Sequence, residues 1–131
     1  MIVLDTHAWI WFISNPEYLS RRAEKAVNDA VKDKSVLISS ISVWELALLV
    51  KKKRIELTLE VTDWIAKSES LAFINFVPVT NSIAVKSVNL PLPLNPDPAD
   101  RIIIATALSV GAPVVTKDKK LLGDSSIKTI W

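Results

Sequence analysis

The sequence predicts a single α/β domain over residues 1–131, built as a three-layer α/β/α sandwich with a mainly parallel sheet of about five strands. Short apolar, β-branched runs alternate with longer segments of helical periodicity, which is typical of parallel strands joined by crossover helices. No linker, repeat or low-complexity tract divides the chain. Half of the residues are hydrophobic and 23% are charged, a composition that fits one folded domain with a real core.

The first strand and helix are predicted at the N-terminus. Residues 2–4 (Ile-Val-Leu) form a compact apolar run that ends at Asp5, as expected of a central, buried strand. Residues 6–13 follow as one or two helical turns, which stop at Asn15-Pro16. The aromatic residues in this helix are expected mainly in the core, with one face available to a protein partner.

Two helices and a second strand are expected next. Ser20 is a candidate N-cap for a helix through about residue 31, and residues 36–38 form a second buried strand. Ser42 and Glu45 are expected in the first turn of the following helix, which ends in the basic run 51–54. Positive charge suits a solvated helix C-terminus, and contact with an RNA backbone is the alternative role of this run. Ser42 and Glu45 also match the Ser-x-x-Glu capping box, a purely structural role for this acid.

The remaining elements are less strongly marked. They comprise a helix over about 58–72, a third strand within 73–79, a short helix over 81–88, a proline-rich connector over 91–98, a helical turn near Leu121 and a last strand over about 128–130.

The most strongly marked helix lies between Asp97 and Gly111. Asp97 is a candidate N-cap and Pro98 occupies the first helical position, where its missing N–H carries no cost. Asp100 falls in the first turn, where the helix dipole favours a carboxylate. Gly111 ends the helix, and a short β-branched strand (114–116) then leads to Asp118.

Four acids from distant parts of the chain are therefore expected at one edge of the sheet. Asp5 and Asp118 follow strands, whereas Glu45 and Asp100 lie near helix starts, and sites in such sheets form outside the carboxyl ends of the strands. Clustered carboxylates repel unless a cation or proton intervenes. A hard divalent ion such as Mg²⁺ takes oxygen ligands and can promote attack of water on a phosphodiester.

Supporting roles are assigned on the same grounds. Thr116 has a hydroxyl that could orient a ligand or water, and Arg101 or Lys117 could bind phosphate. Asp97 is more consistent with a helix cap than with a metal ligand, although both remain open. His7 is the sole histidine and makes no zinc site.

Overall charge and cysteine content set limits on the class of protein. Cysteine is absent, which excludes disulfides and thiolate metal sites and fits the cytoplasm. The N-terminus lacks signal-peptide features, and no apolar run is long enough to span a membrane. Net charge is +2, but if Asp97 shares one pocket with Asp5, Glu45, Asp100 and Asp118, nine acids remain outside it against 16 Lys and Arg. That surface would attract polyanions mildly.

Four blocks of this sequence, in order, resemble the PIN domain family, and more narrowly its VapC-type toxin ribonucleases. They are Met-Ile-Val-Leu-Asp5-Thr-His-Ala, Ile41-Ser-Val-Trp-Glu45-Leu-Ala, Asp97-Pro-Ala-Asp100-Arg-Ile-Ile-Ile-Ala-Thr-Ala and Val115-Thr-Lys-Asp118. The chain departs from relatives after the third helix, where they often carry Gly-Arg-Leu and this chain reads Lys52-Lys-Arg-Ile55.

The resemblance implies an endoribonuclease that depends on Mg²⁺ or Mn²⁺. It implies Asp5 and Asp100 as the principal metal ligands, with Glu45 and Asp118 completing a catalytic acidic site and Thr116 supporting it. It further implies inhibition by a small VapB-type antitoxin, docked near the acidic pocket and the aromatic cluster, and a homodimer.

Three alternatives differ in class or role. An RNA-processing PIN nuclease outside a toxin–antitoxin pair is the main one. A Mg²⁺-binding receiver module would need paired acids after the first strand, but Asp5 is followed by Thr6. An Asp-x-Asp phosphatase is disfavoured because His7 stands where the second acid would be.

Overall fold

A five-stranded, fully parallel sheet forms the centre of the molecule. The structure is a computed structural model that describes residues 1–91, 97–118 and 127–131. Neighbouring strands follow the order β3-β2-β1-β4-β5, and each adjacent pair is parallel. The strands are β1 (Ile2–Leu4), β2 (Val36–Ser39), β3 (Ile74–Val77), β4 (Val114–Val115) and β5 (Thr129–Ile130). The predicted α/β fold with a central first strand is confirmed.

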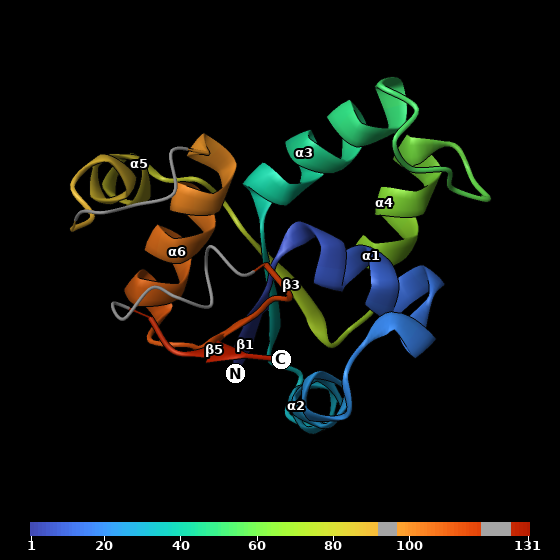
Figure 1. The fold of residues 1–131 in the computed structure, drawn as a ribbon, viewed down its shortest axis with the longest axis horizontal. Helices are drawn as coiled ribbons and strands as arrows, with labels where there is room; N and C mark the ends of the chain where they lie inside the picture. Colours follow the sequence, from blue (N-terminus) through green and yellow to red (C-terminus); the bar gives the residue numbers. More distant parts are fainter. Residues whose placement is uncertain (92–96, 119–126) are drawn as a thin grey trace.

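Helices cover both faces of this sheet (Figure 1). One core packs α6 against β1 and β4, with α5 lying on the outer side of α6. The larger core, on the opposite face, contains residues of α1, α2, α3 and α4. The helical elements are α1 (Thr6–Ser14), the 3-10 helix η1 (Pro16–Tyr18), α2 (Arg21–Lys32), α3 (Ser40–Lys51), α4 (Val61–Glu69), α5 (Asn81–Val88) and α6 (Pro98–Val110).

The first strand explains why both faces must be covered. Ile2 and Leu4 belong to the larger core, whereas Val3 points to the α6 side, and all three side chains are buried. A strand that is apolar on every residue is stable only between two helical layers. Trp9 of α1 fills the larger core: it is completely buried, and its indole N–H donates to Ser68 Oγ over 3.2 Å.

Helix α6 has the boundaries that its end signals predict. The Asp97 side chain caps it by accepting from the amides of Ala99 and Asp100, and Pro98 is its first residue. Gly111 ends it with φ +70°, in the left-handed region that suits glycine.

The start of α3 differs from the prediction. The helix begins at Ser40, and the side chain that caps it is that of Ser39, which accepts from Ile41 N. The strand β2 runs into the helix with no loop between them, so the cap is the last strand residue. Ser42 is consequently buried inside the helix and Glu45 lies in its second turn, so the predicted capping box is wrong.

Other boundaries also shift by a few residues. Helix α4 starts at Val61 rather than near residue 58 and ends at Glu69, and β3 covers only the middle of its predicted range. The predicted turn near Leu121 and most of the proline-rich connector lie outside the described residues. In the described part of the chain, no helix combines the length and the apolar character needed to cross a membrane.

Candidate active site

An acidic pocket opens at the carboxyl ends of β1 and β4, between α1, α3 and α6. Its volume is about 590 Å³. All five acids singled out in the sequence line it, together with basic and aromatic side chains. The lining residues are Asp5, Thr6, His7, Trp11, Glu45, Leu49, Arg54, Asp97, Asp100, Lys117 and Asp118.

Strand register brings the first and last of these acids together. Leu4 pairs with Val115, so Asp5 and Thr116 each follow directly after paired residues of adjacent strands. The Thr116 hydroxyl donates to Asp5 Oδ2, and the same hydroxyl oxygen accepts from the Asp118 amide over 3.0 Å. One buried threonine therefore fixes both a carboxylate and the backbone that carries another.

Asp5 is buried, with 7% of its surface exposed. Its second oxygen, Oδ1, accepts from Ala8 N over 2.8 Å, so that Asp5 also caps α1. Burial raises the pKa of Asp5 to about 6, although the hydrogen bonds from Thr116 and Ala8 oppose that rise. The carboxylate is thus held rigidly in a position where its charge is unfavourable without a cation.

Asp100 lies across the pocket in the first turn of α6 and is partly buried. Burial, followed by the negative charges of Asp97, Asp118, Glu45 and Asp5, raises its pKa to about 7. Asp100 is thus close enough to the other four acids for each of their charges to disfavour its ionised form. The predicted convergence is therefore present in the structure.

Three acids are close enough to share one ion. Single carboxylate oxygens of Glu45, Asp97 and Asp100 all lie within 4.8 Å of one another. Asp97 uses Oδ1 for capping, at 2.9 Å from Ala99 N and 3.2 Å from Asp100 N. A capping role and a place in the acidic group are therefore compatible for Asp97.

A hydrogen bond between helices supports the position of Glu45. Thr6 Oγ1 donates to Ser42 Oγ over 2.9 Å in the buried contact between α1 and α3. Glu45 lies three residues beyond Ser42, so this contact orients the face of α3 that meets the pocket. The two hydroxyls were not predicted as part of the site, because their pairing depends on how the helices pack.

Basic and aromatic side chains border the acids. Lys117 lies with its Nζ 5.8 Å from the ring centroid of Trp11, and both line the pocket. Arg54 reaches the pocket because the chain reverses at Lys53, which has φ +58°, and the Arg54 amide bonds to Leu49 O. His7, expected in a local role, is exposed at the rim and its ring contacts Trp11.

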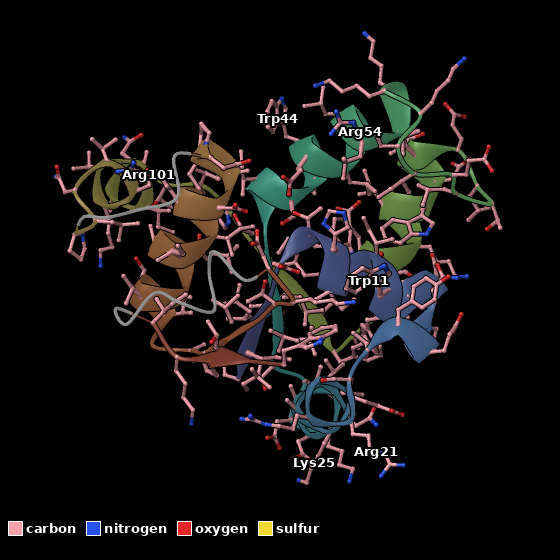
Figure 2. The ribbon with its side chains drawn as sticks, viewed as in Figure 1. Trp11, Arg21, Lys25, Trp44, Arg54 and Arg101 are labelled. Atoms are coloured by element: carbon pink, nitrogen blue, oxygen red, sulfur yellow. The ribbon has the colours of Figure 1, made fainter. Side chains whose placement is uncertain are left out.

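Arg101 is placed differently from the other candidate phosphate ligands. Its Nε donates to Ser87 O over 3.0 Å and its Nη2 to Val88 O over 3.1 Å, at the C-terminal end of α5 (Figure 2). It is not among the pocket-lining residues. These bonds give Arg101 a structural role in holding α5 against α6.

Comparisons with known proteins agree with this architecture. The family model described as PIN domain matches residues 2–123. Ribonuclease VapC22 of Mycobacterium tuberculosis (strain ATCC 25618 / H37Rv) is 36% identical over 132 residues, which cover 99% of this chain and 98% of that protein.

Solved structures resemble the fold at lower identity. A toxin–antitoxin complex from Klebsiella pneumoniae matches with a TM-score of 0.64 at 22% identity, covering 95% of this chain and 93% of that chain. VapBC2 from Rickettsia felis, bound to a DNA fragment from its promoter, matches with a TM-score of 0.68 at 17% identity. The match covers 98% of this chain and 97% of that chain. At these identities the likeness establishes the shared fold.

Proposed function

Because the chain belongs to the PIN domain family, we propose that it is a metal-dependent endoribonuclease and the toxin of a VapBC-type toxin–antitoxin pair. The observation that carries the nuclease function is the pocket in which five carboxylates converge. Two of them, Asp5 and Asp100, have raised pKa values, chiefly because they are buried and, for Asp100, also because of the negative charges of the other four acids. The name of the 36% identical relative supports RNA as the substrate.

The pocket suits Mg²⁺ or Mn²⁺ by the chemistry of its donors. Its acidic donors are carboxylate oxygens, the hard ligands that such ions prefer, and a cation would offset the cost of ionising buried Asp5. We propose Asp5, Glu45, Asp100 and Asp118 as the catalytic, metal-binding residues, with Asp97 in support. A cation bound there would activate water for attack and reduce the negative charge at the phosphate.

The protein's own contribution is to fix the acids and to attract the substrate. Thr116 and the Ala8 amide hold the Asp5 carboxylate by both of its oxygens. The carboxylate is therefore oriented before the reaction, and no further entropy is lost in fixing it. Lys117 and Arg54 line the same pocket and supply positive charge for an RNA phosphate. Between these cations and acids, a phosphodiester can be bound and presented to water.

The proposed partners follow from the relatives. We propose that a VapB-type antitoxin binds this chain near the acidic pocket, where Trp11 offers a partly exposed aromatic surface, and that the chain forms a homodimer. RNA as substrate and a chain without cysteine favour the cytoplasm as its place of action. Co-purification with the product of a short neighbouring reading frame would test the partner directly.

The activity is tested with purified protein and labelled single-stranded RNA. We expect cleavage in Mg²⁺, none in excess EDTA, and at least a roughly 100-fold lower rate in Asp5→Asn and in Asp100→Asn. Asp29→Asn is the matched control, because it removes the same charge from an exposed position on α2, away from the pocket. Circular dichroism would verify that all variants are folded. Cleavage that persists in EDTA, or in both pocket variants, would contradict the proposal.

A further inference from the structure

A second hollow adjoins the acidic pocket and carries an exposed tryptophan. It has a volume of about 230 Å³ and is lined by Trp44, Glu45, Leu48, Leu49, Lys52, Arg54, Asp97 and Pro98. Four of these residues (Glu45, Leu49, Arg54 and Asp97) also line the acidic pocket, so the two hollows lie side by side. Figure 2 shows Trp44 and Arg54 along α3, on the side of the molecule that carries the N-terminal end of α6.

Trp44 is unusual among the tryptophans of this protein. Its side chain is 57% exposed, whereas Trp9 and Trp64 are buried in the core. Trp44, Leu48 and Lys52 follow each other at intervals of four residues, so they form one stripe along α3. That stripe runs from the aromatic ring beside Glu45 to an exposed ammonium group at the helix C-terminus.

We propose that Trp44 stacks on a base of the RNA next to the scissile phosphate, while Arg54 and Lys52, toward the C-terminal end of α3, bind neighbouring phosphates of the same strand. An exposed aromatic ring with cations in the same groove is the usual platform for an unpaired nucleotide, since every base offers a π-face and every linkage a negative charge. Arg54 lines both hollows and therefore lies where the phosphate between the cleaved bond and the stacked base would pass. This inference rests on the proposed ribonuclease function and adds a substrate-binding residue to it.

The charges favour RNA over an apolar partner in this hollow. Two cations and two acids line it beside the ring, and the acids belong to the proposed metal site. A base needs only a flat apolar face, whereas a docked protein helix would leave the Lys52 and Arg54 charges to be desolvated. The small volume also suits one planar group better than a larger apolar ligand, whose sites typically measure about 300–1,000 Å³.

The test measures RNA affinity with and without the Trp44 ring, and with and without bases in the bound strand. Fluorescence anisotropy would compare a 12-nucleotide oligoadenylate with a 12-nucleotide abasic ribose-phosphate chain, using Asp100→Asn protein so that RNA survives. We expect Trp44→Ala to weaken oligoadenylate binding by about 5- to 100-fold and to leave abasic binding unchanged. Trp44→Phe should restore most of the affinity, and Val88→Ala, at an exposed apolar position on α5, should change nothing.

Two results would overturn this inference. One is oligoadenylate affinity in Trp44→Ala equal to that of the parent protein. The other is a Trp44→Ala protein that loses its dimer in analytical ultracentrifugation while its RNA affinity per subunit is retained, which would make this face a contact between copies. Failure of the proposed function is separately visible, because RNA cleavage retained by both Asp5→Asn and Asp100→Asn would contradict the acidic site, whereas the comparison of Trp44→Ala with its parent measures binding and not cleavage.

Discussion

The hydroxyl group of Thr116 donates a hydrogen bond to the Asp5 carboxylate, joining residues 111 positions apart in the sequence. Both side chains are buried, and the same hydroxyl oxygen accepts the Asp118 amide. This contact links the carboxyl ends of β1 and β4 and stabilises the ionised form of Asp5, whose pKa burial raises. Thr116 therefore acts on the site through Asp5.

Removing the Thr116 hydroxyl is expected to lower the affinity of the acidic pocket for divalent ions while strand β4 stays folded. In Thr116→Val, Asp5 loses a hydrogen bond to its charged form, so its pKa should rise further above 6. Divalent-ion affinity should fall by about 10- to 100-fold, the usual effect of losing a group that orients a ligand. Calorimetric titration with Mn²⁺ would measure this, and Thr116→Ser, which keeps the hydroxyl, should stay close to the parent. Equal Mn²⁺ affinity in the parent, Thr116→Val and Thr116→Ser would show that Thr116 does not support the metal site.

The raised pKa values also predict how stability depends on pH. Because Asp5 and Asp100 have folded pKa values of about 6 and 7, the folded protein without metal binds more protons than the unfolded chain between about pH 4 and 7. The stability that these two acids contribute is therefore fully present below the ordinary Asp pKa and is lost as the pH rises through about 6 and 7. Asp5 alone accounts for about 2 to 3 kcal/mol of this decline.

Thermal unfolding in EDTA at pH 5 and pH 8 would measure this effect. We expect a lower melting temperature at pH 8, with added Mg²⁺ raising it there far more than at pH 5, because the cation binds the ionised acids. The Asp5→Asn protein should show a smaller pH dependence. A melting temperature that is unchanged between the two pH values would contradict the raised pKa values.

The turn after α3 stores a small amount of strain. Lys53 has φ +58°, a region that costs a residue with a side chain roughly 1 kcal/mol relative to glycine. Lys53→Gly is expected to stabilise the protein by about 0.5 kcal/mol, the net of this relief and the greater freedom of glycine in the unfolded chain. Arg54 should keep its place, because its amide bond to Leu49 O does not involve the Lys53 side chain.

The neighbouring residue is a matched control for this turn. Lys52 has φ −81°, so Lys52→Gly gains nothing in the folded state and should destabilise by about 0.5 to 1 kcal/mol. Urea unfolding would measure the free energy of unfolding, which should increase in Lys53→Gly and decrease in Lys52→Gly. Destabilisation by Lys53→Gly would indicate that the turn is not strained at that residue.

Local signals and tertiary packing explain which features the sequence could predict. The limits of α6 follow from Asp97, Pro98 and Gly111, each of which acts within one turn of its own position. The meeting of the acids follows from strand ends for Asp5 and Asp118 and from helix starts for Glu45 and Asp100, because parallel strands place their carboxyl ends, and the helix starts that follow them, on one edge. These parts of the prediction needed no knowledge of distant contacts.

The parts that were wrong or missing depend on contacts between distant residues. Whether Ser39 or Ser42 caps α3 is decided by where β2 stops pairing with its neighbours, and several serines in a row give no local preference. Ser42 instead meets Thr6, a partner 36 positions away. Arg54 enters the pocket only because Lys53 adopts a backbone conformation that lysine rarely takes.

Asp97 offers a substitution that separates its two roles. Its side chain caps α6 through Oδ1, and an oxygen of the same carboxylate lies within 4.8 Å of ligand atoms from Glu45 and Asp100. Asp97→Asn keeps a carbonyl oxygen for the cap but removes the negative charge, so it should leave the stability near that of the parent. Asp97→Ala should lose about 1 kcal/mol through the missing cap.

Asp97→Asn and Asp97→Ala are therefore expected to differ in stability but to agree in metal binding. If Asp97 contributes charge to the site, both should bind Mn²⁺ more weakly, and in both the pKa of Asp100 should fall, because the Asp97 charge that helps raise it is gone. Chemical denaturation and calorimetric titration measure the two properties independently. Parent-like Mn²⁺ affinity in Asp97→Asn, together with lower stability in Asp97→Ala, would identify Asp97 as a helix cap alone.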